Sequence, residues 1–527
     1  MGNNIYRMTD DEYAIFARKY PMVTRSDMNK VEELLTQKMY ADMASHAQTS
    51  EIELLKSKAL GAMGTEQEMN FSDIESGMLR ASLSDGRQAL KEIMERTPVE
   101  APSCGDSTKM SNQGREKKNI MTTLGVVKGV GRARYRDEID NVNVYPLDEK
   151  IGLLTIGGRH SRYTGNFACL SAEFYARMPE RDALELLGKT LNIELEQASL
   201  TSIGAAVAQP YLPKPHDESG DTDEVLHPVT NGQDFIEKRI QEIDNSPDRE
   251  SIIEKALEEG AEGAGRRRTE SDKSVAYVEA DGTGVSGLPR ELSDKGKSGG
   301  PAKTFEAKIG VMFSQSFDSG GLPLLKNGRI FRDPDSTQYM GTVEKAAQFT
   351  MQLDAFTRMY GIGSADQVVF LSDGAIWLEK LRLKLFPNSI GIIDLFHARE
   401  HLYKLVDSLC FYKKNTKTAF YEECSRLLDL GDIDSLVSLV SQKTTKSNKD
   451  DIDKQLGYFS SNKEKMRYGL FRAAGLFIGS GVVESACKTI VENRLNGSGM
   501  RWTKKNAANV IALRCAIYSD KYGSAVA

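Results

Sequence analysis

The stretch from residue 274 to residue 397 constrains the fold most, because its hydrophobic pattern changes from strands alone to an alternation of helices and strands. Two long segments come first, SVAYVEADGTGV and AKTFEAKIGVMFSQSF, and both have the character of strands. They are followed by an amphipathic helix that closes at Gly361, the buried strand QVVFLSDG, the helix AIWLEKLRLKLF and the buried strand SIGIIDLFH. This order predicts a mixed sheet flanked by helices.

The whole sequence predicts an α+β protein with several domains. Before the sheet we expect a helical region (1–104), a basic strand-rich element (105–150), a helix-turn-helix-like DNA-binding region (151–210) and a linker (211–273). The sheet region would occupy 274–410 and resume at 476–527, after a helical insertion at 411–475. Plain helical packing remains an alternative for 151–210, because any two short helices look alike in sequence.

Composition disfavours several classes of protein. No segment approaches the roughly 18 consecutive apolar residues of a membrane span, so we expect a cytoplasmic protein, located at the bacterial nucleoid. The six cysteines form no C-x-x-C pair, which argues against a disulfide framework or a cysteine zinc site. The sequence also lacks the H-E-x-x-H, P-loop and G-x-S-x-G motifs.

The formal net charge of -6 means that any DNA contact has to come from local basic patches. One such patch covers residues 109–136 and the other covers 484–521. The candidate DNA-binding residues in them are Arg132, Arg134, Arg136, Lys488, Arg494, Arg501, Trp502, Lys504 and Lys505. A solvated surface is the alternative for each patch. Trp502 could stack on a base or wedge into distorted DNA, whereas Trp377 is expected in the core.

Two of the apolar strands are predicted to end in Asp followed by Gly, at Asp281 and Asp373. Carboxylates at strand ends suit hard divalent cations, although Asp-Gly is also a common turn. A third carboxylate is expected from a helix, where Glu484 follows a Gly-rich turn and Glu492 and Glu400 compete with it. Two metal ions about 4 Å apart can activate a nucleophile and stabilise the leaving oxygen in phosphoryl transfer. Two Asp and one Glu would meet that requirement.

Six ordered blocks of the sequence resemble insertion-sequence transposases of the ISKra family. They are AYVEADGTGV, AKTFEAKIGVMF, FRDPDSTQYMGTVEKAAQF, SDGAIWL, FPNSIGIIDLFHAREHLYKL, and FIGSGVVESACKTIVENRLNGSGMRW with NVIALRC. The resemblance covers residues 275–518 densely and 120–205 loosely. It implies an RNase H-like core in which Asp281, Asp373 and Glu484 are the DDE carboxylates. The interval of 111 residues from Asp373 to Glu484 then accommodates the helical insertion.

The resemblance also implies an activity. Such an enzyme binds the terminal inverted repeats of its element as double-stranded DNA, cleaves the ends and joins their 3′-hydroxyls to target DNA. Two Mg²⁺ ions would serve both steps, with Mn²⁺ as a substitute, and pairing two ends implies at least a homodimer on DNA. A domesticated DNA-binding protein and a structure-specific metal-dependent nuclease are the alternatives.

One further motif resembles a related family, and one feature that is common in the ISKra family is missing from this sequence. Asp394-Leu-Phe-His397 resembles the [C/D]-x-x-H signature of Mutator-like transposases, which implies that His397 lies near the active site. A histidine that only caps a strand is the alternative, and His401 is expected to pack structurally. Relatives often carry paired cysteines between the basic strands and the helix-turn-helix, and this sequence has none there.

Overall fold

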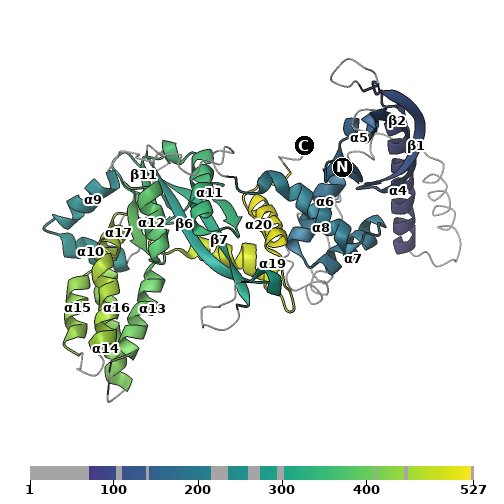
Figure 1. Ribbon diagram of the computed structural model, residues 1–527. Helices are drawn as coiled ribbons and strands as arrows, with labels where there is room; N and C mark the ends of the chain where they lie inside the picture. The colour runs from purple at the N-terminus through teal and green to yellow at the C-terminus, as the bar shows by residue number, and fades with distance from the viewer. Residues whose placement is uncertain are drawn as a thin grey trace, which may run out of the picture. The chain divides into compact units, whose positions relative to one another are not determined.

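The computed structural model describes residues 71–102, 110–137, 142–214, 235–258, 273–292, 302–409, 411, 414–443 and 449–523 (Figure 1). The chain divides into two compact units, which are Met1–Tyr211 with Lys521–Ala527, and Leu212–Asp520. The helices predicted before residue 71 lie outside the described residues. Within the described part of the chain, no helix is long and apolar enough to cross a membrane.

The first unit contains a five-stranded sheet with the strand order β3-β2-β1-β5-β4. Its first elements are α4 (Phe71–Arg96), β1 (Ser111–Thr122), β2 (Gly125–Asp137), β3 (Val142–Val144), α5 (Pro146–Lys150), β4 (Leu153–Ile156) and β5 (Arg159–Thr164). The hairpin of β1 and β2 confirms the predicted strands, and α4 packs on β2.

Helices α6 (Gly165–Arg177), α7 (Glu180–Leu191) and α8 (Gln197–Ala208), followed by the turn η1 (Gln209–Tyr211), complete this unit. The two predicted helices and the turn between them are present, and α7 ends at Asn192 in the left-handed conformation. Leu200, Ile203 and Val207 are buried, and α8 packs on α6. Helix α8 also has no charged side chain. These observations describe a packed helix, and the DNA-binding role of this region stays a prediction.

Gly204 lies where α8 meets α6 most closely. A Cβ atom on Gly204 would lie 2.4 Å from Cδ1 of the fully buried Tyr175. Alanine gains about 1 kcal/mol over glycine inside a helix, but overpacking a core costs about 1–3 kcal/mol. We therefore expect Gly204→Ala to lower the free energy of unfolding by about 1 kcal/mol. In urea unfolding, Gly188→Ala on α7 is the control, because its nearest atom is 3.9 Å away. A Gly204→Ala variant as stable as Gly188→Ala would contradict the expectation.

The second unit is built on a five-stranded sheet with the order β10-β7-β6-β11-β12. These strands are β6 (Lys273–Ser286), β7 (Thr304–Phe317), β10 (Gln338–Thr342), β11 (Gln367–Ser372) and β12 (Ile390–Ile393). Strands β6, β7 and β10 pair antiparallel, and β11 and β12 extend the sheet parallel to β6. This confirms the predicted mixed sheet. Two short strands, β8 (Leu325–Lys326) and β9 (Arg329–Ile330), form a separate hairpin.

The two faces of β6 differ because side chains alternate along a strand. On one face Ala276, Val278 and Ala280 belong to an apolar core that includes α11 (Ala346–Met359) and α12 (Ile376–Leu385). Trp377 packs against this core, which confirms its predicted position. The other face contacts the C-terminal segment, drawn in yellow in Figure 1. Its elements are α18 (Gly481–Ala486), the π-helix η6 (Cys487–Glu492), α19 (Asn493–Leu495) and α20 (Lys504–Tyr518).

The helices predicted over 411–475 are present among the described residues of that stretch. They are α14 (Lys414–Leu430), α15 (Ile433–Ser441), α16 (Lys449–Asn462), η5 (Lys463–Lys465) and α17 (Tyr468–Ala473). Helix α13 (Leu395–Asp407) leads into them and packs on α14 and α16. The linker predicted over 211–273 is partly wrong. It contains α9 (Phe235–Asp244) and α10 (Arg249–Glu258), whose buried isoleucines form apolar faces that pack on α17.

Candidate active site

The register of the parallel strands brings three aspartates to one edge of the sheet. Glu279 of β6 pairs with Leu371 of β11, so Asp281 lies at the level of Asp373, the residue directly after β11. In the same way, the pairing of Ser372 with Ile393 places Asp373 at the level of Asp394. The carboxyl ends of parallel strands are the usual position of binding sites in open sheets. The two aspartates singled out in the sequence therefore lie on neighbouring strands.

The predicted strand end at Asp281 is wrong, because β6 continues to Ser286. Its last residues pair with the first residues of β7, and Asp281 itself pairs with Ile309. The parallel pairing with β11 nevertheless stops at Glu279. Asp281 is thus held by an antiparallel ladder on one side and lies beyond the last parallel pair on the other. A strand continued on one side gives the carboxylate a fixed position.

Burial raises the pKa of Asp281, and the nearby negative charge of Asp373 raises it further. The backbone N–H of Gly282 and the charge of His397 act in the opposite direction. The Cys487 thiol lies 3.8 Å from Oδ2 of Asp281. Burial raises the pKa of this thiol, so it stays protonated and can donate to the carboxylate. The repulsion between the two aspartates is the kind of cost that a bound cation offsets.

Asp373 is followed by a glycine whose conformation is left-handed. Gly374 has a φ of +87°, and its Cβ position would lie 3.4 Å from the hydroxyl of Tyr458. Oδ1 of Asp373 accepts a hydrogen bond of 2.8 Å from the N–H of Ala375. Tyr458 of the insertion helix α16 therefore lies beside this turn. Gly374 is therefore needed both for its φ and for the space beside it.

Tyr458 is a residue of this site that the sequence did not single out. It stacks on His401 with ring centroids 4.1 Å apart, which agrees with the structural packing predicted for His401. Burial raises the pKa of Tyr458, as do the charges of Asp373 and Asp394. Among the described residues its buried hydroxyl has no hydrogen-bond partner. Nothing in the sequence pattern of α16 distinguishes this tyrosine, because its contacts with His401 and with the turn at Gly374 form only in the folded protein.

Asp394 and His397 form the first turn of α13, so this part of the predicted strand is helical instead. Oδ1 of Asp394 accepts a bond of 2.8 Å from the His397 N–H and lies 3.4 Å from His397 Nδ1. Burial alone would raise the pKa of Asp394, but the hydrogen bonds from His397 and Ser480 lower it. The bond to Asp394 raises the pKa of His397 to about 8. The charges of Asp281 and Asp373 both interact with this histidine, as expected for a residue near the site.

The raised pKa of His397 makes stability depend on pH. A histidine whose folded-state pKa lies above its unfolded value of about 6.5 stabilises the fold fully below that pH. This stabilisation is lost as the pH rises through about 8. We therefore expect the urea midpoint of the parent to fall between pH 6 and pH 8.5 by more than that of His397→Gln. The variant is the control for other groups that titrate here, such as Glu279. Equal falls in both proteins would contradict the expectation.

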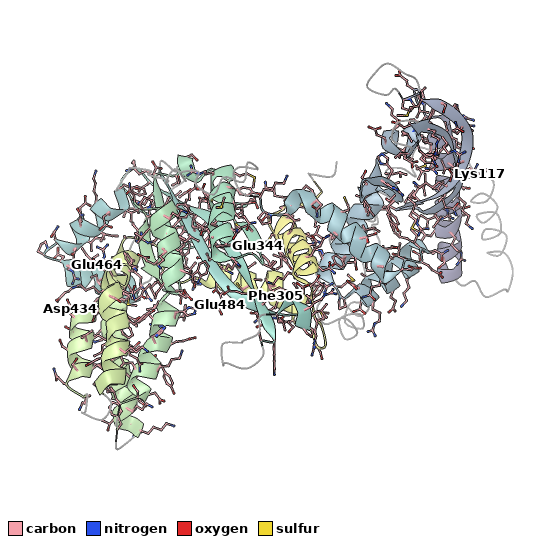
Figure 2. All side chains as sticks on the ribbon, viewed as in Figure 1. Lys117, Phe305, Glu344, Asp434, Glu464 and Glu484 are labelled. Carbon is pink, nitrogen blue, oxygen red and sulfur yellow. The ribbon has the colours of Figure 1, made fainter. Side chains whose placement is uncertain are left out.

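Glu484 lies in the first turn of α18 and its side chain is exposed. Figure 2 shows it beside the long ribbon of β6 and β7. Its helix is tied to β6 on both sides of this position, at Val483 by a 2.8 Å bond to Glu279 and at Cys487 by the contact with Asp281. Among the described residues, no three His, Cys, Asp or Glu side chains are arranged to hold a metal ion. Asp281 and Asp373 therefore lie at the same level of the sheet, whereas the side chain of Glu484 is exposed to solvent.

The competing glutamates occupy different positions. Glu492, at the end of the π-helix, accepts a 2.8 Å hydrogen bond from the hydroxyl of Thr283. Glu400 is exposed on α13, one turn beyond His397. A π-helical turn widens the helix and often occurs at functional sites. Here it separates Glu484, whose side chain is exposed, from Glu492, which bonds Thr283 of β6.

Three of the predicted DNA contacts are buried instead. Arg132 is 4% exposed and bonds Asp148 at 2.6 Å, where it has an acidic partner within its own unit. Trp502 is 7% exposed and donates its indole N–H to the Leu495 carbonyl at 2.9 Å, while the Arg494 guanidinium lies 4.9 Å from its ring. Arg494 is 2% exposed. These contacts contradict a direct DNA contact by these three side chains in this structure, since each is already packed inside its unit.

The other predicted DNA contacts lie at the surface. Lys488, Arg501, Lys504 and Lys505 are exposed in the second unit, and Arg134 and Arg136 are partly exposed on β2 of the first. Lys488 follows Cys487 directly, so a cation lies one residue from the contact with Asp281.

Neither the protein-family models nor the curated proteins that were compared with this chain give a match.

Proposed function

We propose that this protein is a DDE-type DNA transposase with an RNase H-like core. The observation that carries the proposal is the juxtaposition of Asp281 and Asp373 on neighbouring strands, with Glu484 on a helix tied to the same strand. The strand order of the sheet, with three antiparallel strands extended by two parallel ones, supports an RNase H-like core. The proposed activity rests on the six sequence blocks that resemble ISKra-family transposases.

The donor set of the site fits a divalent cation. Carboxylate oxygens are the ligands that Mg²⁺ prefers, and the repulsion between Asp281 and Asp373 would be relieved by a positive charge. Asp281, Asp373 and Glu484 would hold two Mg²⁺ ions, or Mn²⁺ in their place, with Glu484 turning in from its exposed position. When bound, these ions would activate the attacking hydroxyl and stabilise the leaving oxygen of an in-line phosphoryl transfer.

The remaining residues of the site would orient DNA and keep the aspartates in place. Lys488, Arg501, Lys504 and Lys505 are exposed cations of the unit that carries the site, and they would contact the phosphate backbone. The first unit, with the helices α7 and α8, would bind the inverted repeats at the element ends. Because two ends have to be joined in one reaction, the active form would be at least a dimer on DNA.

The test is an assay of cleavage and joining. The full-length protein is incubated with labelled duplexes from the two ends of the DNA element around its gene, together with plasmid target, in Mg²⁺, Mn²⁺ or EDTA. We expect cleavage at the ends and joining of their 3′ strands to the target in both metals and neither in EDTA. Cleavage without joining would identify a nuclease, and end binding without cleavage would identify a domesticated DNA-binding protein. Either result would overturn the proposal.

A further inference from the structure

Two buried carboxylates outside the proposed metal set hold the start of α18. Glu279 of β6 is fully buried, and its Oε2 accepts a hydrogen bond of 2.8 Å from the N–H of Val483. Asp394 is 2% exposed, and its Oδ2 accepts a bond of 2.9 Å from the hydroxyl of Ser480 and another from the N–H of that residue. Glu279 lies on β6 and Asp394 lies directly after β12, so the helix start is held at two points.

Helix α18 has no side-chain cap of its own. Its N-cap residue, Ser480, makes no side-chain bond to the first turn, because its hydroxyl points to Asp394 instead. The first N–H groups of a helix lack partners within the helix, and the N-cap side chain usually accepts a bond from one of them. In this protein Glu279 of β6 accepts from Val483 in the first turn, and Asp394, directly after β12, accepts from Ser480. The position of α18 therefore follows the strands that carry the site.

The hydrogen bond to Val483 is the feature of the structure that explains a carboxyl group at position 279. Glu279 lies on a strand face between Tyr277 and Asp281 and is fully buried, and burying a carboxyl group is costly unless the group is hydrogen-bonded. The Oε1 atom of Glu279 has no hydrogen-bond partner among the described residues, so the side chain is hydrogen-bonded there through Oε2 to the N–H of Val483.

We propose that Glu279 is a positioning residue, which together with Asp394 fixes α18 so that Glu484 stays within reach of the two aspartates of the sheet. The inference rests on the proposed function, because it assumes that Glu484 acts at the metal site. Glu484 follows Val483 directly, so a movement of the helix start moves Glu484 as well. A displacement of about 1 Å in catalytic geometry can lower a rate about 10²-fold.

The test compares Glu279→Met, Glu279→Gln and the control Gln367→Met. Methionine removes the acceptor at similar size, whereas the glutamine amide oxygen can still accept from Val483. Gln367 is also buried, at the start of β11, and bonds Asn388 rather than α18. Hydrogen exchange of peptides covering residues 480–486 is measured together with the rate of end cleavage and thermal unfolding. Both rates are taken at a temperature where circular dichroism shows every variant folded.

We expect exchange in this segment to be at least about tenfold faster in Glu279→Met, because an anchored N–H is released. We expect its cleavage rate to fall about 10²-fold while DNA-end binding stays unchanged. Glu279→Gln and Gln367→Met should both stay within about threefold of the parent in exchange and in rate. Parent-like exchange in Glu279→Met would overturn the inference whether or not the parent cuts DNA. Faster exchange with an unchanged cleavage rate would overturn the positioning role, and a parent that does not cut would instead overturn the proposed function.

Discussion

Asp281→Asn and Asp373→Asn are each expected to lower the rate of end cleavage by about 10³-fold or more, with binding to end DNA unchanged. Asparagine keeps the shape of the side chain but lacks the charge that a divalent cation needs. Asp281 lies on β6 and Asp373 lies at the same level directly after β11, and we expect both carboxylates to be needed for the proposed metal set. The rate is measured in single turnover with labelled ends, and end binding is measured by gel shift in Ca²⁺.

The same two variants should not lose stability. Burial and the charge of Asp373 both raise the pKa of Asp281, which means that the ionised pair is unfavourable in the fold. Removing one charge should therefore leave the thermal midpoint unchanged or raise it. Asp366→Asn is the matched control, because Asp366 lies at the opposite end of the same strand pair and bonds the Ser274 N–H at 2.8 Å. Parent-like cleavage by either site variant, or a loss in the Asp366→Asn control as large as theirs, would contradict the assignment.

The second large effect separates Glu484 from its competitors. We expect Glu484→Gln to cleave at least about 10²-fold more slowly than the parent, because it removes the third carboxylate of the metal set. Glu492→Gln should stay within a few-fold, because its amide oxygen can still accept the bond from Thr283. Glu400→Gln should also stay close to the parent, since Glu400 is exposed on α13.

These three variants have to be compared at several Mg²⁺ concentrations. Loss of a metal ligand should shift the Mg²⁺ dependence of cleavage to higher concentration, and Glu484→Gln is expected to show this shift. An inactive Glu492→Gln beside an active Glu484→Gln would assign the third carboxylate to the end of the π-helix instead. Because Glu484 is turned to solvent in this structure, its assignment depends on this comparison more than those of the aspartates do.

Periodicity predicted much of the second unit. The strands β7 and β11, the helices α11 and α12 and the helices of the insertion all follow from apolar spacing, which local sequence encodes directly. The end of β6 did not follow in this way, because the strand continues through Asp-Gly only where β7 pairs with it. The helices α9 and α10 were likewise hidden in a polar segment, since few of their residues are apolar and those few pack on α17.

In the candidate site, too, some residues could be predicted from local sequence and others depend on contacts that are distant in sequence. Asp281 and Asp373 were visible in the sequence because each carboxylate follows an apolar run. Glu279 was visible only as a charge inside such a run, and its partner Val483 comes 204 residues later. The basic DNA-binding residues were predicted from charge alone, which cannot tell an exposed arginine from one with a buried partner. Arg132, which bonds Asp148, is the example.

The long separation between β6 and its cover sets an order of events during synthesis. The residues that contact the Glu279 side of β6 lie between Val483 and Trp502, so they leave the ribosome more than 200 positions after the strand residues that they contact. Until they arrive, Glu279 has no N–H to bind and Asp281 has no thiol beside it. Closing such a long loop is slow compared with local helix formation. A nascent or shortened chain that ends before Ser480 would therefore carry both aspartates but lack Glu484 and the segment that covers them, so the proposed metal set would be incomplete until the C-terminal segment is made.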